Sequence, residues 1–390
     1  MTSPTSPPSQ RVPVGTRGLW RGGLSSRGLQ GKEPLRGLAA LLVLVGVVAV
    51  VAARVILHMG GPSLAVGSWA AVSGPQTTIH AFLRAPSGTV YAATAMGVYC
   101  SADNGATWNV AGQGFPGSGV QAFSLAVLHG TSAGRQTDVL LAAADDGYIY
   151  RLSLSNGAAD RWERSVAPVG AGTYSLLTLP TPDTALAGTD RGIVRSSDGG
   201  RSWRLVAAIA GGDVAAFARD PASGMIYAGL AGLPRPLRVS ADDGLTWRTP
   251  SASLPPPSVE SLLVLSGRLY VGVMQTTGQL PVWSGALGQG GRSTNFAPSS
   301  AGLPGANAHG MVLAASDSAG DRVLVGTMGL GVYSRAGHGA WTRLGDLANI
   351  DTTMGTGTVT ALSILPGESD DQHPIVLAGA GQGIYRTLLP

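Results

Sequence analysis

The sequence has a single cysteine, Cys100, among its 390 residues, and only 12% of the residues are charged. A lone cysteine excludes an intramolecular disulfide and leaves no basis for a cysteine-based zinc site, so we expect Cys100 to be a small buried strand residue. What the chain does have is 58 glycines, 25 prolines and 44% hydrophobic residues. That combination indicates many short buried strands joined by tight turns.

Positive charge is scarce outside the N-terminal segment. The chain has a formal net charge of +4, but residues 1–36 contain six basic residues against Glu33 alone. Once Arg54 is also set aside, the remainder of the chain is slightly acidic. This balance removes the main electrostatic argument for a nucleic-acid partner, and we predict none.

A long apolar run covers residues 37–53, is interrupted by Arg54 and continues to Leu57. About 20 residues cross a bilayer core, a length that the run reaches if Arg54 extends toward the interface. We predict a single transmembrane helix at 37–58, preceded by a disordered basic tail at 1–36 and followed by a linker at 59–66. The alternative is a cleaved signal peptide, but the basic region is longer than such peptides usually have.

The charge distribution around the apolar run predicts the topology of the chain. The basic residues lie before the run and no such cluster follows it. Basic segments stay in the cytoplasm, so we expect a single-pass protein of the cell membrane with its N-terminus inside. Everything after the span is then outside the cytoplasm.

An octapeptide of the form Ser-x-Asp-x-Gly-x-Thr/Ser-Trp occurs three times, at 101–108, 196–203 and 240–247. Its Asp side chain can accept backbone N–H bonds across a tight turn, its Gly supplies a positive φ, and its Trp packs beneath. We therefore interpret these residues as structural rather than catalytic. They are Ser101, Asp103, Gly105, Trp108, Ser196, Asp198, Gly200, Trp203, Ser240, Asp242, Gly244 and Trp247.

A second phrase, made of a strand, a Gly-containing turn and another strand, recurs seven times. Its copies begin at Val90, Val139, Ala185, Ile226, Leu269, Val323 and Val376. In three copies without the Asp, an aromatic residue still occupies the Trp position, so contacts other than those of an Asp side chain must stabilise these turns. Those residues are Trp162, Phe296 and Trp341.

The repeat period of about 40 to 50 residues fits one four-stranded blade per repeat. We predict an all-β fold, a β-propeller of about seven blades at 67–390. The blades are expected near 77–116, 117–168, 169–209, 210–255, 256–304, 305–348 and 349–390. The last copy lacks its Trp strand, and GSWAAV at 67–72 resembles it. Residues 67–75 should therefore complete the last blade and close the ring.

The octapeptide resembles the Asp box of BNR-repeat propellers, a sialidase-like group within the WD40/YVTN/BNR-like superfamily. The group also includes other glycan-cleaving propellers and photosystem II assembly factors. The resemblance covers nearly all of 67–390, but it concerns the fold, and a shared fold does not imply a shared function. Sialidases of this group have an Arg-Ile-Pro signature near the start of the propeller, and none occurs here.

The innermost strands can be aligned on their hydrophobic alternation, which sends the second residue of each to one side, expected to be the central channel. These second residues are His80, Gln121, Tyr174, Ala215, Glu260, His309 and Thr360. Turn residues should join them at the channel mouth. The predicted ligand-binding set is His80, Gln121, Tyr174, Glu260, His309, Asp146, Asp190, Arg191, Arg235 and Gln382. The alternative is that they are polar only because a propeller channel is wet.

These patterns favour a non-catalytic binding or scaffold domain that presents its channel mouth to a protein or glycan, with no cofactor and no metal. Longer turns at 230–236 and 275–280 add loop surface of the kind on which recognition residues are often found. A glycoside hydrolase is the first alternative, with Glu260 paired with Asp146, Asp190 or Asp213. An assembly factor for a membrane protein complex is the second.

Overall fold

The computed structural model describes residues 64–116, 119–132, 135–154, 161–250, 254, 258–274, 281–288, 293–304, 310–315, 321–347, 358–367 and 373–390. The chain divides into two units, Met1–Gly60 and Gly61–Pro390. The predicted tail and membrane segment lie outside the described residues. Within the ranges just given, no helix is long and apolar enough to cross a membrane.

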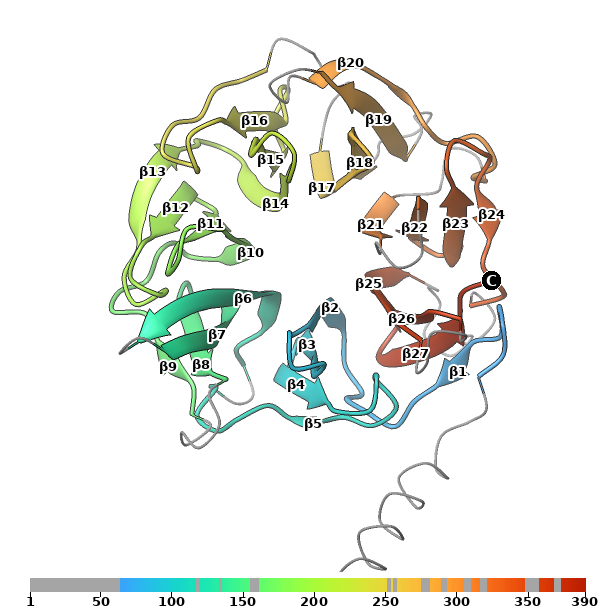
Figure 1. Ribbon diagram of the computed structural model, residues 1–390, viewed down its shortest axis with the longest axis horizontal. Coiled ribbons are helices and arrows are strands. Elements are labelled where there is room, and N and C mark those ends of the chain that lie inside the picture. Colours follow the sequence, from blue (N-terminus) through green and yellow to red (C-terminus); the bar gives the residue numbers. More distant parts are fainter. Residues whose placement is uncertain are drawn as a thin grey trace, which may run out of the picture. The chain divides into compact units, whose positions relative to one another are not determined.

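The unit Gly61–Pro390 consists of seven small antiparallel sheets arranged around a centre (Figure 1). The first four sheets are β2 (Ile79–Arg84), β3 (Val90–Thr94), β4 (Gly97–Ser101), β5 (Asn109–Val110); β6 (Ala122–Ser132), β7 (Arg135–Ala144), β8 (Ile149–Ser153), β9 (Glu163–Arg164); β10 (Thr173–Thr178), β11 (Ala185–Thr189), β12 (Gly192–Ser196), β13 (Arg204–Ala208); and β14 (Asp213–Arg219), β15 (Ile226–Ala231), β16 (Leu237–Ser240). These are blades 1 to 4.

Blades 5 to 7 follow the same order from the inside outward. Their strands are β17 (Ser258–Leu265), β18 (Arg268–Met274), β19 (Val282–Leu287), β20 (Ser293–Pro298); β21 (Gly310–Ala315), β22 (Arg322–Thr327), β23 (Val332–Ala336), β24 (Thr342–Arg343); and β25 (Val359–Leu365), β26 (Ile375–Ala380), β27 (Gly383–Leu388), β1 (Ala70–Ala71). The first strand of every blade contacts the first strands of both neighbours, which closes the ring. The predicted seven-bladed propeller is confirmed.

Small residues in the second strand of each blade allow neighbouring blades to pack closely. The strands β3, β11 and β26 are buried along their whole length because a blade covers each of their faces. A Cβ added to Gly379 would lie 2.6 Å from Cβ of Ile79 in the next blade. Gly229 would meet Val259 of its next blade in the same way. The recurrent glycine of the sequence repeat therefore marks where one blade receives the next.

The N-terminal strand completes the last blade, as the segment GSWAAV suggests. Strand β1 pairs with β27, with Ala70 opposite Arg386 and Ala71 opposite Tyr385. The Gly67 N–H also donates to the Leu388 carbonyl at 3.2 Å. Because the pairing joins the two ends of the folded unit, the last blade has four strands and β1 covers the outer edge of β27.

The three octapeptides form the same turn directly after the third strand of their blades; in blade 4, which has three strands, the chain beyond the turn makes only an isolated bridge between Val239 and Arg248. In the first, Ser101 Oγ donates to Asp103 Oδ1 at 2.7 Å and accepts from Gly105 N at 2.8 Å. The Asp103 carboxylate also accepts from the backbone N–H of Thr107 at 2.9 Å and from its hydroxyl at 2.6 Å. The indole of Trp108 donates to the Gly105 carbonyl at 3.1 Å. Both carboxylate oxygens of Asp103 therefore accept hydrogen bonds from residues of the same turn.

Two consecutive residues of each octapeptide have positive φ. The glycine does so as predicted, and so does the residue before it: φ is 52° at Asn104, 76° at Gly199 and 52° at Asp243. Asn, Gly and Asp are the residue types that tolerate this region. The glycine also packs against the preceding blade, because a Cβ on Gly105 would lie 2.8 Å from Cδ2 of Leu377.

Three tryptophans of blades without the octapeptide link one blade to another. Trp162 in blade 2 donates from its indole to the Ala111 carbonyl of blade 1 at 2.6 Å. Trp341 donates to Ser299, and Trp69 of the closing strand donates to Leu344, both at 2.6 Å. In each case the acceptor lies just past the outer strand of the preceding blade. This contact replaces the internal bond that Trp makes in an Asp-containing turn.

Candidate functional site

Each innermost strand carries a β-bulge near its start, which leaves one residue without a partner in the neighbouring strand. The register shifts between residues 79 and 81 of β2 and between residues 173 and 175 of β10, for example. The unpaired residues of blades 1 to 7 are His80, Phe123, Tyr174, Ala215, Glu260, Met311 and Thr360. These positions have no role in the strand ladder and differ in chemistry from blade to blade.

The bulges correct the strand alignment in two blades. In blade 2 the unpaired residue is Phe123, two residues after the predicted Gln121. In blade 6 it is Met311, whereas the predicted His309 lies outside the described residues. Side chains on a strand alternate with a period of two, so a shift of two residues preserves the hydrophobic pattern and only the bulge fixes the register.

Three of the unpaired side chains form a continuous group on the inner strands of blades 1 to 3. The ring centroids of His80 and Phe123 are 4.7 Å apart, and those of Phe123 and Tyr174 are 5.8 Å apart. We name these three residues the aromatic arc. All three are half-buried, so each packs on its neighbour while part of its surface remains accessible. Gln121 extends the group, because its Oε1 lies 3.3 Å from His80 Nε2.

The surroundings of the arc favour the neutral form of both titratable rings. Burial lowers the pKa of His80, in spite of its contact with Gln121 and the nearby Asp145. Burial raises the pKa of the Tyr174 hydroxyl, and the negative charges of Asp213 and Asp190 raise it further. At neutral pH the arc is therefore an uncharged aromatic surface with carboxylates beside it.

The unpaired residues of the other blades are smaller or aliphatic, or are bonded within the fold. Glu260 accepts a hydrogen bond from Ser258 Oγ at 2.8 Å within its own strand. Thr360 donates to the Ile79 carbonyl at 2.5 Å, which joins blade 7 to blade 1. Ala215 contributes only a methyl group. The ring is thus chemically asymmetric, with its aromatic side chains gathered on blades 1 to 3.

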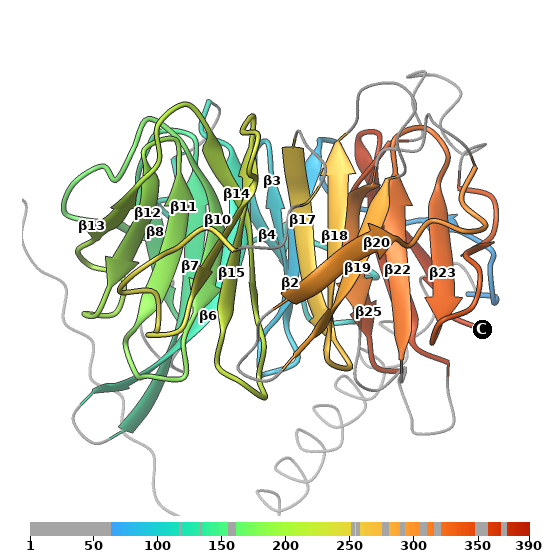
Figure 2. The same cartoon turned by 90° about the horizontal axis from the view of Figure 1, so that it is seen from above.

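The innermost strands begin at the end of the ring where the turns between second and third strands also lie, which we name the mouth face (Figure 2). Several acids, among them the predicted Asp146 and Asp190, are engaged there by their own blade. Asp145 accepts from Gln121 N at 2.9 Å, and Asp190 accepts from Ala171 N at 2.8 Å. Asp146 accepts from the Tyr150 hydroxyl at 2.5 Å. Each carboxylate therefore fixes the local backbone or a neighbouring side chain.

The remaining predicted residues lie in turns of the mouth face and are exposed. They are Arg191 in blade 3, Arg235 in blade 4 and Gln382 in blade 7. No hydrogen bond of the described residues joins these side chains to the aromatic arc. The longer turn at 275–280 lies outside the described residues. Sequence reasoning missed Phe123, although the phrase AFSL at 122–125 aligns with TYSL at 173–176 and contained the signal.

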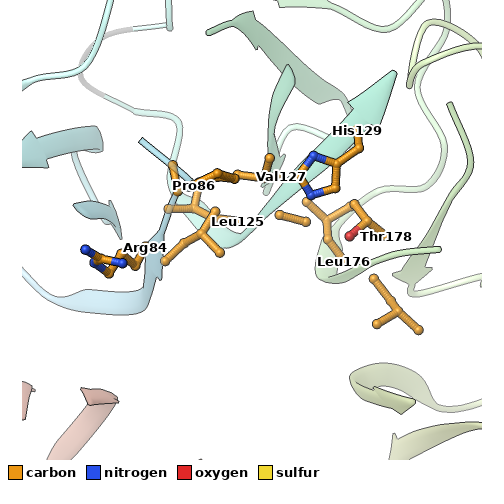
Figure 3. A pocket seen from close by; sticks show the side chains of 11 residues that line it. Arg84, Pro86, Leu125, Val127, His129, Leu176 and Thr178 are labelled. Atoms are coloured by element: carbon orange, nitrogen blue, oxygen red, sulfur yellow. The ribbon is translucent and has the colours of Figure 1, made fainter. Parts of the chain in front are cut away.

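The opposite end of the ring carries the Asp-containing turns, and we name it the box face. Hollows open there between neighbouring blades, with volumes of about 430, 470 and 330 Å³. The first lies between β2, β6 and β10 and is walled by Leu125, Val127 and Leu176, with His129 at its edge (Figure 3). Since these leucine and valine side chains also pack the blades together, the hollow belongs to the blade interfaces.

The part of the chain that the structure describes contains no group of three His, Cys, Asp or Glu side chains able to hold a metal ion. Three ion pairs occur in this part: His129 with Asp138, Arg151 with Glu163, and Arg343 with Asp346. None of them involves an acid of the mouth face.

Comparison with known proteins identifies the fold and nothing narrower. No protein-family model and no curated protein matches the sequence. Among solved structures, YCF48 bound to D1 peptide is 16% identical with a TM-score of 0.55, and the match covers 85% of this chain and 100% of that one. Likeness at this level of identity shows a shared fold only.

Two further solved structures are similar to this chain over part of their length. The extracellular domain of BT4673 from B. thetaiotaomicron is 14% identical (TM-score 0.58), covering 82% of this chain and 39% of that one. The GH74 xyloglucanase from Xanthomonas campestris is 19% identical (TM-score 0.57), covering 82% and 53%. This chain therefore spans about two fifths and about half of those proteins. All of the structures named are β-propellers.

Proposed function

We propose that this chain is a membrane-anchored propeller of the Asp-box type that binds a peptide segment of another protein at its mouth face, outside the cytoplasm, without catalysis. The aromatic arc is the observation that carries the proposal. Its residues lie at the β-bulges of their inner strands, where they have no partner in the neighbouring strand, and they are half-exposed. Aromatic side chains with accessible surface are typical anchors of recognition sites.

The state of the mouth acids supports binding rather than hydrolysis. A glycosidase needs two carboxyl groups facing a sugar bond, one of them free to give or take a proton. Of the acids that could pair with Glu260, Asp146 and Asp190 instead accept hydrogen bonds that hold their own blades, which leaves the Asp213 carboxylate as the one without such a bond among the described residues. Glu260, the strongest candidate acid, accepts from Ser258. These carboxylates stabilise the ring that presents the arc.

The similar structures agree with a peptide ligand. YCF48, which this chain matches over that protein's full length, has been solved with a peptide bound. BT4673 supplies an extracellular domain with the same fold. The three Asp-containing turns, with their shared hydrogen bonds, support placing this chain with the Asp-box propellers.

The binding proposal is tested with the full chain in detergent micelles, immobilised and panned against a displayed library of random heptapeptides. Phe123→Ala and Tyr174→Ala are expected to lose the selected peptides by at least about tenfold, since each removes a hot-spot aromatic. Leu245→Ala, an exposed residue of the box face, is the matched control. Peptides that bind all three variants equally would contradict the proposal.

A glycan panel tests the alternative activity. The wild-type chain and Glu260→Gln are incubated with oligosaccharides and polysaccharides, and both binding and new reducing ends are measured. We expect no cleavage by either protein. Cleavage that disappears in Glu260→Gln would replace the binding proposal with a glycoside hydrolase.

The membrane topology is tested by cysteine labelling, because the natural chain has only Cys100. In a Cys100→Ala background, Gln382→Cys places a thiol on an exposed turn and Ser9→Cys places one in the basic tail. A membrane-impermeant maleimide applied to intact cells should label the first and not the second. The reverse pattern would place the propeller in the cytoplasm.

A further inference from the structure

The charges around the aromatic arc identify the kind of side chain that it receives, an inference that rests on the proposed function. The arc offers neutral rings, and the faces of Phe and Tyr attract cations through the ring quadrupole. Phe123 lies at the centre, with His80 on one side and Tyr174 on the other. A ligand group resting on Phe123 is therefore within reach of both neighbours.

Carboxylates lie at both ends of the arc. Asp145 lies close enough to His80 to act on its charge, and Asp213 and Asp190 act in the same way on Tyr174. Asp145 accepts one backbone N–H bond and Asp190 accepts two, and neither carboxylate forms an ion pair with a described residue. The carboxylate of Asp213, the first residue of β14, makes no hydrogen bond or ion pair with any described residue, although its backbone lies opposite Ala231 in the strand ladder. It is the free acceptor of the group.

No described cation neutralises these carboxylates. The ion pairs of the described chain lie elsewhere, on β6 and β7, between β8 and β9, and after β24. Arg191 and Arg235 are exposed on their turns. The charged groups that shift the pKa of His80 and Tyr174 are the acids Asp145, Asp213 and Asp190. The mouth beside the arc is therefore negative, and an anionic ligand is disfavoured there.

We propose that the arc binds an arginine or lysine side chain of the partner segment, with the cation stacked on Phe123 and Tyr174 and paired with Asp213. A cation within about 6 Å of a ring centroid gains from the ring face, and more when it is desolvated. The half-buried rings supply that desolvation, while the carboxylate supplies the charge partner. A neutral sugar or a plain aliphatic side chain would use the rings and leave Asp213 unpaired.

The experiment uses the full chain in detergent micelles and peptides selected from the heptapeptide library. We expect the selected peptides to share an Arg or Lys. Replacing that Arg by citrulline, a neutral residue of the same shape, should weaken binding by about tenfold or more. Asp213→Asn should weaken the parent peptide by a similar factor and should reduce its loss of affinity with added salt.

Phe123→Leu and Glu163→Gln complete the set. Phe123→Leu keeps apolar volume and removes the ring face, so it should weaken the Arg peptide more than its citrulline form. Glu163→Gln removes an exposed acid of the outer strand β9, whose partner Arg151 lies on β8 rather than on an inner strand, and it is the control for the loss of one negative charge in Asp213→Asn. All variants are first compared with the wild type by thermal unfolding.

The outcomes separate the two proposals. Peptides that need Phe123 but contain no shared basic residue would overturn the cation inference and leave the binding function standing. Basic peptides that bind Asp213→Asn and Phe123→Leu as well as the wild type would also overturn it, because their binding would be non-specific. A library that yields no peptide dependent on the arc would overturn both.

Discussion

Alanine at Gly105 tests how tightly an Asp-containing turn is fitted against the preceding blade. Gly105 has a φ of +82°, and its added Cβ would lie 2.8 Å from Cδ2 of Leu377. The left-handed conformation costs an L-residue about 1 to 2 kcal/mol. Displacing the fully buried Leu377 adds about 1 to 2 kcal/mol, as overpacking does. We therefore expect Gly105→Ala to lower the free energy of unfolding by about 2 to 4 kcal/mol.

Gly211→Ala separates the two contributions. Gly211 has a φ of +76° with nothing within 4 Å of an added Cβ, so alanine there meets only the backbone cost. Urea unfolding followed by tryptophan fluorescence measures both variants, with Leu377→Ala and the double variant completing a cycle. The Gly105→Ala loss should shrink toward the Gly211→Ala value when Leu377 is shortened. Equal losses at the two glycines in the wild-type background would refute the tight fit between blades.

Three further predictions concern single side chains. Trp69→Phe removes the donor to the Leu344 carbonyl and should cost about 1 kcal/mol in urea unfolding, and no loss would show that this bond does not hold the closing strand. Asp198→Ala should cost about 1 to 2 kcal/mol at pH 7. Burial alone would raise the Asp198 pKa, but hydrogen bonds from Ser202 and Ser196 outweigh it and hold the pKa below 3.8. This contribution to the free energy of unfolding is present above the pKa of Asp198 in the unfolded chain and is lost as pH falls through its pKa in the folded chain. If Asp198→Ala were as much less stable than the wild type at pH 2 as at pH 7, the prediction would be contradicted. His80 has a pKa lowered from 6.5 by burial, so the unfolded chain takes up its proton first and stability falls as pH drops below 6.5. His80→Gln should flatten the decline in unfolding free energy between pH 6.5 and 5, and parallel profiles would contradict this assignment.

The sequence predicts the parts of the fold that depend on short-range chemistry. In SADNGATW, the roles of Ser101, Asp103, Gly105 and Trp108 follow from turn geometry, and the structure shows those contacts. The positive φ of Asn104 was also readable, because Asn, Gly and Asp fill that place in the three copies. The closing strand was predictable because GSWAAV keeps the Trp that marks a fourth strand.

The candidate site was less predictable because it depends on register. Hydrophobic alternation has a period of two, so it fits VQAFS and AFSLA equally well and cannot choose between Gln121 and Phe123. Only the bulge places Phe123 level with His80 and Tyr174. The tryptophan bonds between blades were beyond the sequence for another reason. The acceptors of Trp162 and Trp341 are 51 and 42 residues away, in a blade that only the assembled ring brings near.

The pairing of β1 with β27 has a consequence for biosynthesis. The Ala65 carbonyl and the Thr387 hydroxyl that bond beside this pairing are 322 residues apart in sequence. At roughly 5 to 20 residues per second, a ribosome needs about 15 to 60 s to make the intervening chain. Throughout that time the first-made strand has no partner and the growing row of blades has two open ends. A nascent chain that stops before Gly383 lacks the whole of β27, so it cannot close and keeps both ends available for pairing with other chains.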